Sequence, residues 1–215
     1  MKALLLVALA CSAMAQPNDL MARMQAITRD LGISCNYCHS AERGSGQPEP
    51  KKEIARAMIA MTRDINARIR EAAGSGATEV QCVTCHRGVP IPRQLSQILS
   101  QTIREKGAAE AASQYRDLRQ RYYGRQAYDF GEETLVGLAQ PLSNGRPDDA
   151  IVLLQLNLDY YPQSAKTYAA LAYAYTRKFD DTTAITYLEK ALQIEPENGV
   201  VRGQLEQLKS YRRNR

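Results

Sequence analysis

The sequence predicts an all-α chain in two parts, and three patterns lead to that prediction. Apolar residues recur at helical spacing over residues 18–31 and again over residues 51–72. Residues 165–198 match a two-helix repeat pattern of about 34 residues. With 215 residues, 44% of them hydrophobic, the chain is long enough for one ordinary domain or two small ones.

The N-terminal segment, residues 1–15, reads MKALLLVALACSAMA and has the composition of a cleaved secretory signal. A lysine is followed by a short apolar run and by small residues at Ala13 and Ala15. Cleavage after Ala15 predicts an exported, periplasmic protein. The alternative is a lipoprotein site that leaves Cys11 lipidated and tethers the protein to a membrane. No later apolar stretch approaches the roughly 20 residues that cross a bilayer.

Each of the next two predicted helices leads into a Cys-x-x-Cys-His motif. The helix at 18–31 ends at Gly32, and its motif occupies residues 35–39. The helix at 51–72 precedes the motif at 82–86. Aligning Thr-Arg-Asp in the first helix with Thr-Arg-Asp in the second shows that the two segments repeat one unit, a helix followed by a motif.

The two motifs contain four cysteines and the only two histidines of the chain. They are Cys35, Cys38 and His39, and Cys82, Cys85 and His86. In c-type haem attachment, two thiols add across the haem vinyl groups and the adjacent imidazole binds the iron. Zinc sites and plain disulfides use the same residue types, but neither requires a histidine directly behind the cysteine pair. The motifs therefore predict two covalently bound haems c.

The sixth iron ligand has to come from a residue other than histidine, or the position stays open. The methionines that follow the signal all lie on the two helices before the motifs: Met21, Met24, Met58 and Met61. A thioether suits haem iron, although methionines on an apolar helix face also fill gaps in cores. A ligand should recur in both units, and the internal alignment pairs Met24 with Met58. These two are the predicted axial ligands.

Residues 51–66 (KKEIARAMIAMTRDIN) and 80–92 (VQCVTCHRGVPIP) resemble the cytochrome c subunit of photosynthetic reaction centres. Residues 23–39 (RMQAITRDLGISCNYCH) resemble its companion haem unit. The resemblance covers about residues 18–92 and implies Met24 with His39 for one haem and Met58 with His86 for the other. Photosynthetic members carry four haems, one with a second histidine ligand, whereas this sequence has two motifs and no spare histidine.

Beyond Pro92 the composition changes, since eleven of the twelve tyrosines lie after residue 100. Residues 165–198 resemble a tetratricopeptide repeat, with an offset partial repeat before them and a predicted capping helix at 199–211. The matching positions are Tyr168, Leu171, Ala172, Tyr175, Ala184, Leu188, Ala191 and Pro196. We predict a dihaem cytochrome c domain over residues 16–92 and a short helical solenoid over residues 93–215.

Together these features predict an electron-transfer protein that is not an enzyme. It would pass single electrons between redox partner proteins, with a membrane-bound complex among the candidates, and would dock one of them through the helical repeats. A dihaem peroxidase-like enzyme and an assembly adaptor with accessory haems are the alternatives. The mature chain has 27 basic and 23 acidic residues, and this small excess gives no reason to predict a nucleic-acid partner.

Overall fold

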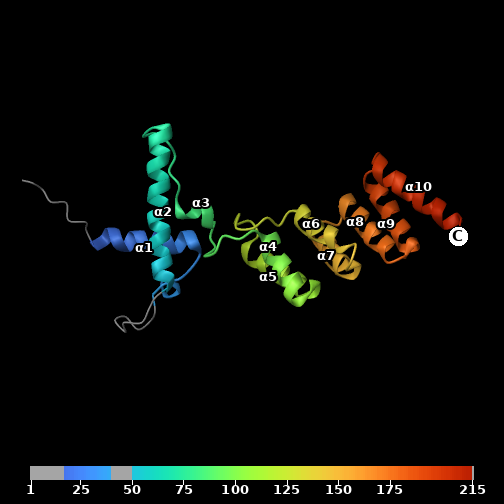
Figure 1. Cartoon of the computed structure of the whole chain (residues 1–215), viewed down its shortest axis with the longest axis horizontal. Helices are drawn as coiled ribbons and strands as arrows, with labels where there is room; N and C mark the ends of the chain where they lie inside the picture. The colour runs from blue at the N-terminus through green and yellow to red at the C-terminus, as the bar shows by residue number, and fades with distance from the viewer. Residues whose placement is uncertain (1–16, 40–49, 215) are drawn as a thin grey trace, which may run out of the picture. The chain divides into compact units, whose positions relative to one another are not determined.

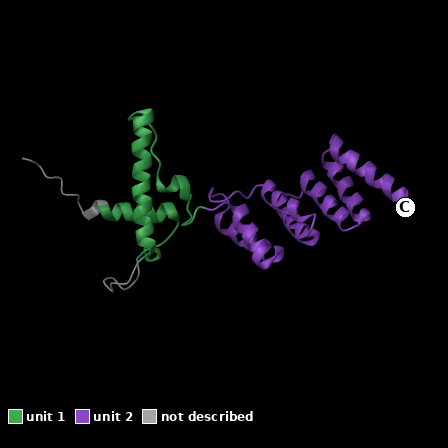
Figure 2. Ribbon diagram, in the orientation of Figure 1, with its two compact units in different colours: residues 1–92 green, residues 93–215 purple. Residues whose placement is uncertain are grey.

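The computed structural model describes residues 17–39 and 50–214, and the regular elements in these ranges are all helical (Figure 1). The all-α prediction is therefore confirmed. The predicted signal peptide at 1–15 and the alternative lipidation site Cys11 lie outside the described residues. Within them, no helix is both long enough and apolar enough to cross a membrane. The chain divides into two compact units, residues 1–92 and 93–215 (Figure 2).

The described part of the first unit contains three α-helices and one short 3-10 helix. These are α1 (Pro17–Leu31), η1 (Cys35–Tyr37), α2 (Pro50–Ala73) and α3 (Cys82–His86). The bounds of α1 and α2 agree with the predicted 18–31 and 51–72 to within one residue at each end. Both helices begin at a proline, whose fixed φ suits the first helical position.

A tight turn connects α1 to the first motif. Gly32 has φ +63°, the left-handed conformation in which helices commonly end. The backbone N–H of Ile33 donates to the carbonyl of Thr28 at 3.0 Å, and the N–H of Gly32 donates to that of Arg29 at 3.2 Å. These two bonds satisfy carbonyls that the end of the helix leaves unpaired, so η1 begins three residues after Gly32.

The second unit is a succession of α-helices joined by short loops. They are α4 (Leu95–Lys106), α5 (Ala108–Tyr122), α6 (Glu132–Leu142), α7 (Pro147–Tyr160), α8 (Ala165–Arg177), α9 (Asp181–Ile194) and α10 (Gly199–Arg213). Helix α4 packs on α5, and from α6 to α10 each helix packs on the next. The predicted last helix at 199–211 corresponds to α10.

Capping residues and a continuous apolar core define the helices of the second unit. Ser164, Asp180 and Asn198 each accept a hydrogen bond from the backbone N–H three residues ahead, at 2.9, 3.0 and 3.1 Å. Such caps satisfy one of the free N–H groups at a helix start and contribute about 1 kcal/mol each. Behind them, fully buried leucines from α4, α6, α7 and α8 form one cluster, and α8, α9 and α10 form a second.

The positions that matched the repeat pattern pack inside α8 and α9. Leu171, Ala172, Ala184, Leu188 and Ala191 are all buried. The rings of Tyr168 and Tyr175 both stack on Tyr187, with centroid distances of 6.1 and 5.5 Å. Packing of this kind is common to helical hairpins of many α folds, so the tetratricopeptide assignment stays a prediction.

Candidate functional site

The first motif lies beside a cavity between α1 and α2. The cavity has a volume of about 360 Å³, and its lining includes Met24, Cys35, Cys38 and His39, all four residues predicted for one haem. Met24 lies on α1, the cysteines lie in and just after η1, and Ile27 and Ile59 add apolar walls from the two helices. Met21, by contrast, is 61% exposed and is not part of this lining.

Two cations line the same cavity from the first turns of α2. Lys52 and Arg56 are one helical turn apart, so their side chains leave the same face of α2. Among the residues that the structure describes, no carboxylate lines the cavity, and Arg56 also forms an exposed ion pair with Glu53. An otherwise apolar cavity with cations at one wall suits a large, flat, apolar group that carries negative charge on one side.

The second motif forms α3, which ends at His86. The backbone N–H of Gln81 donates to the hydroxyl of Thr84 at 3.1 Å, which caps the helix start. The Nδ1 of His86 lies 3.0 Å from the carbonyl oxygen of Val89. A carbonyl only accepts, so Nδ1 carries the proton and Nε2 keeps its lone pair for a metal. This backbone contact is the usual way in which a metal-ligating imidazole is oriented.

A buried amide fixes the segment that leads into α3. The Nδ2 of Asn66 donates to the carbonyl of Val80 at 2.9 Å, and the backbone N–H of Val80 donates to Oδ1 of Asn66 at 2.7 Å. Asn66 is the one buried residue of α2, and this pair of bonds holds residue 80 against the helix. Cys82 therefore starts α3 at a defined place along α2.

The thiol of Cys82 lies at a second cavity of about 300 Å³, again between α1 and α2. Ile27 and Ile59 line this cavity as well as the first. Burial raises the pKa of the Cys82 thiol, and the negative charge of Asp30 raises it further. Neither Met58 nor His86 is part of this lining. The residues predicted to bind the second haem therefore do not line one cavity, in contrast to those predicted for the first haem.

Met58 instead lies on an exposed apolar face of α2. This face consists of Ile54, Met58, Met61 and Ile65, at helical spacings that place them in one stripe. Met58 is 43% exposed and Met61 is 46% exposed. The exposed fractions therefore do not distinguish the predicted ligand, Met58, from Met61. Val83 on α3 is a further exposed apolar residue, two positions before the exposed Cys85.

The two motifs contact each other through the turns beside them. The N–H of Gly88, just after α3, donates to the carbonyl of Asp30 at the end of α1 at 3.0 Å. A Cβ at Gly32 would overlap the carbonyl oxygen of Gly88, so only glycine allows the two turns to approach this closely. The two predicted haem units are thus parts of one packed arrangement and not separate modules.

The residues of the first unit fit covalently bound haem. All four cysteines in the motifs are free thiols, and no three His, Cys, Asp or Glu side chains among the described residues gather into a metal cluster. Two thiols, an imidazole and a thioether at one apolar cavity are a donor set that suits haem c. Sequence reasoning missed Lys52, Arg56 and Asn66. The spacing of Lys52 and Arg56 with Ile59 on one helix face was the signal that would have found the two cations, whereas no local pattern indicated Asn66.

An all-helical unit with two Cys-x-x-Cys-His motifs, one of them at an apolar cavity that a methionine also lines, defines a c-type cytochrome. Residues 11–136 match the family of the photosynthetic reaction centre cytochrome C subunit. The chain belongs to that family, as the resemblance over residues 18–92 predicted. Its proteins are electron-transfer proteins rather than enzymes, and family membership implies covalently bound haem c.

Two named relatives match shorter segments. Cytochrome c-554 of Chloroflexus aurantiacus is 36% identical over 67 residues, which are 31% of this chain and 16% of that protein. The photosynthetic reaction center cytochrome c subunit of Rubrivivax gelatinosus is 38% identical over 75 residues, 34% of this chain and 20% of that protein. The chain therefore matches no more than about a fifth of the length of either relative.

Proposed function

We propose that this chain is an exported dihaem cytochrome c that passes single electrons between partner proteins, and that its second unit docks one of them. The observation that supports the proposal best is the cavity lined by Met24, Cys35, Cys38 and His39. This cavity supports the proposal because the two thiols, the imidazole and the thioether predicted for one haem all line it. When bound, haem supplies an iron that gains or loses one electron at a time.

Each residue of this set has a separate role in the proposal. Cys35 and Cys38 would hold the haem covalently through their thiols. His39 and Met24 would supply its two protein ligands to iron, and iron with two protein ligands is suited to electron transfer and not to peroxidase chemistry. A thioether ligand also raises the reduction potential relative to ligands that favour ferric iron.

For the second haem, Cys82 and Cys85 would supply the thioethers and His86 one axial ligand. The contact from His86 Nδ1 to the carbonyl of Val89 supports this role because it places the proton on Nδ1 and leaves the lone pair of Nε2 for iron. Met58 is proposed as the other iron ligand because the internal sequence alignment pairs it with Met24. The exposed apolar stripe that contains Met58 supports the proposal, since a bound macrocycle would remove that surface from water.

The haem count tests the cytochrome part of the proposal. The full chain, produced with a haem-attachment system in an oxidising compartment, should give two haems per protein by the pyridine haemochrome assay. Mass spectrometry of the same product would locate the processed N-terminus and would show whether Cys11 is lipidated. A folded product that contains zinc and no haem absorbance would end the cytochrome interpretation.

The docking part has its own test. A protein that stops at Pro92 should keep both haems, because every proposed ligand precedes that residue. Its reduction by the physiological donor, or its binding to a membrane-bound partner complex, should weaken. Unchanged partner binding would instead favour a docking surface in the first unit, and an adaptor role for the second unit would then have no support.

A further inference from the structure

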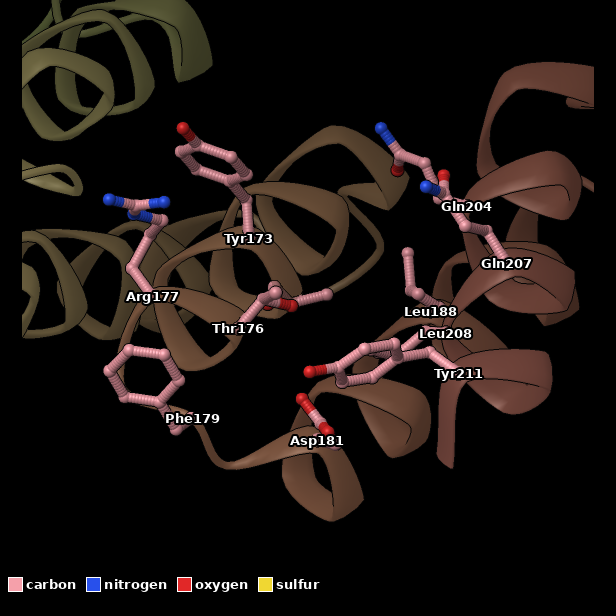
Figure 3. Close-up of a pocket in the computed structure, with 11 residues that line it drawn as sticks. Tyr173, Thr176, Arg177, Phe179, Asp181, Leu188, Gln204, Gln207, Leu208 and Tyr211 are labelled. Carbon is pink, nitrogen blue, oxygen red and sulfur yellow. The ribbon is translucent and has the colours of Figure 1, made fainter. Parts of the chain in front are cut away.

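The groove between α8 and α10 of the second unit has none of the residue types predicted to attach or ligate haem. It has a volume of about 520 Å³ (Figure 3). Its lining includes one arginine, Arg177, and one aspartate, Asp181, but no cysteine, histidine or methionine. A residue that positions a haem ligand is therefore expected in the first unit, which contains both motifs.

The two haem units return their motif to the preceding helix in different ways. The internal alignment of the two units pairs Gly32 with Asn66. In the first unit α1 ends just before Gly32, and Cys35 follows that glycine by three residues. In the second unit α2 continues to Ala73, and Cys82 follows Asn66 by sixteen residues. The second motif therefore needs a contact that brings a longer connection back to its helix.

Asn66 supplies this contact through both polar atoms of its side chain. In the first unit the backbone N–H two residues before the motif, that of Ile33, donates to the carbonyl of Thr28 in α1 at 3.0 Å. The corresponding N–H of the second unit, that of Val80, donates to Oδ1 of Asn66 at 2.7 Å. The Nδ2 of Asn66 donates back to the carbonyl of Val80 at 2.9 Å. Asn66 is only 8% exposed, and buried hydrogen bonds are costly to break. Its amide thus takes the place of the backbone turn of the first unit.

The second motif is connected to α2 before α3 and to α1 after it. Helix α3 packs on α1, and the N–H of Gly88 donates to the carbonyl of Asp30 in α1 at 3.0 Å. On the α2 side, an ion pair between Arg70 and Glu79 accompanies the Asn66 bonds, but both of its side chains are about half exposed. Exposed ion pairs contribute little to stability. The Asn66 amide is therefore the stronger link between the second motif and α2, the helix that contains Met58.

We infer that Asn66 is a positioning residue for the second haem. It sets the register of the second motif along α2, so that His86 and Met58 can ligate the same iron. In the first unit Met24 precedes Gly32 by eight residues. In the second unit Met58 precedes Asn66 by the same number, so a motif held at Asn66 keeps the spacing between ligand and motif that the first unit has. The inference rests on the proposed ligation of the second haem and extends it to a residue that is not itself a ligand.

Asn66→Leu in the full-length, haem-loaded protein tests the inference, because it removes both bonds to Val80. The pyridine haemochrome assay should still give two haems, since every cysteine and histidine remains and the motif stays bonded to α1. The weak far-red absorption of ferric His/Met haem should fall by about half, and one of the two reduction potentials should fall. In a Met58→Ala background, Asn66→Leu should lower neither potential further, because the ligand that it positions is already absent.

Arg70→Ala is the matched control, because it removes the exposed ion pair that links the same segment to α2. It should keep the full far-red absorption and both potentials. Asn66→Asp is a second variant of nearly the same size, which keeps an acceptor for the Val80 N–H and loses the donor to the Val80 carbonyl. It should lose part of the far-red absorption, and it decides the question by the same criteria if Asn66→Leu gives no folded protein.

Unchanged far-red absorption and potentials in Asn66→Leu would overturn the inference, as would an equal loss in Arg70→Ala. A further fall in potential in the Met58→Ala background would overturn it too. Loss of haem from either motif in Asn66→Asp would show a role in folding instead of positioning, with the same consequence. If the unchanged protein has two haems without the far-red absorption, the proposed Met ligation fails and this inference fails with it. The spectrum of the unchanged protein therefore separates that failure from one confined to Asn66.

Discussion

The two units of the chain differ in where their apolar side chains lie. Among the described residues, every buried hydrophobic residue except Val89 belongs to the second unit. In the first unit, apolar residues instead line the cavity beside Met24 or form the exposed stripe on α2. The second unit therefore has a protein core of its own, whereas the apolar surface of the first unit lies at the cavity and on the exposed face of α2, which the proposed haems would cover. We infer that folding of the first unit depends on haem attachment and that folding of the second does not.

Removal of all thioether bonds should have the largest effect. A variant with serine at Cys35, Cys38, Cys82 and Cys85 should carry no haem, and its residues 50–92 should become sensitive to protease while residues 93–215 resist. Burial of apolar surface is the main source of stability, and this variant leaves the first unit without it. Limited proteolysis with mass spectrometry of the fragments would measure the difference.

Replacing one cysteine pair at a time provides the control. Serine at Cys35 and Cys38, or at Cys82 and Cys85, should each remove one haem. If residues 50–92 of the haem-free protein resist protease as well as residues 93–215 do, the first unit has a core that does not need haem, and the comparison between the units is wrong.

A cavity in the core of the second unit should have the next largest effect. Leu154 on α7 is fully buried, and Leu154→Ala should lower the free energy of unfolding of this unit by about 2–5 kcal/mol. The haem absorption spectrum should stay unchanged. Thermal unfolding followed by circular dichroism would measure the loss, and Val200→Ala, at an exposed position of α10, should shift stability by less than about 0.5 kcal/mol. Loss of haem from Leu154→Ala would mean that the two units share one core.

Loss of the axial thioethers should alter the spectra and potentials of the haem unit with little effect on the second unit. Met24→Ala and Met58→Ala should each lower one reduction potential, because the thioether favours the reduced iron. Redox titration and the weak far-red absorption of ferric His/Met haem, which should fall by about half in each variant, would measure this.

The neighbouring methionines are the matched controls for the ligands. Met21→Ala and Met61→Ala should leave both potentials unchanged. For the first haem this expectation agrees with the cavity, which Met24 lines and Met21 does not. For the second it rests on the internal repeat alone, because Met58 and Met61 are equally exposed on one face. A loss of ligation from Met61→Ala in place of Met58→Ala would show that the helix presents its other methionine.

The sequence was sufficient to predict the features that short-range patterns determine, namely the positions of the helices and the type of site. The apolar period of residues 18–31 and 51–72 located α1 and α2, and the order Cys-x-x-Cys-His defined the chemistry of the sites. The contacts between distant residues were not predictable in the same way. The bonds from Asn66 to Val80, and the approach of Gly32 to Gly88, depend on how separate segments pack, and no short-range pattern encodes that packing.

The smallest predicted effect is a pH dependence that belongs to the second unit. Burial raises the pKa of Tyr115 to about 12, and Arg119, whose guanidinium donates toward the Tyr115 hydroxyl, opposes the shift only in part. The folded-state pKa therefore lies above the unfolded value of about 10.

The hydroxyl accordingly stabilises the second unit fully below pH 10, and this contribution is lost as the pH rises from about 10 to about 12, because the unfolded chain gives up its proton first. A shift of one pKa unit corresponds to about 1.4 kcal/mol, so the loss should reach roughly 2–3 kcal/mol across that range. Urea unfolding of the full chain followed by circular dichroism at several alkaline pH values would measure it. Tyr115→Phe keeps the ring that packs on Phe130 and removes the ionisable group, so its stability should fall less steeply over the same range. Equal slopes in the two proteins would mean that Tyr115 ionises in the folded unit as readily as it does in the unfolded chain.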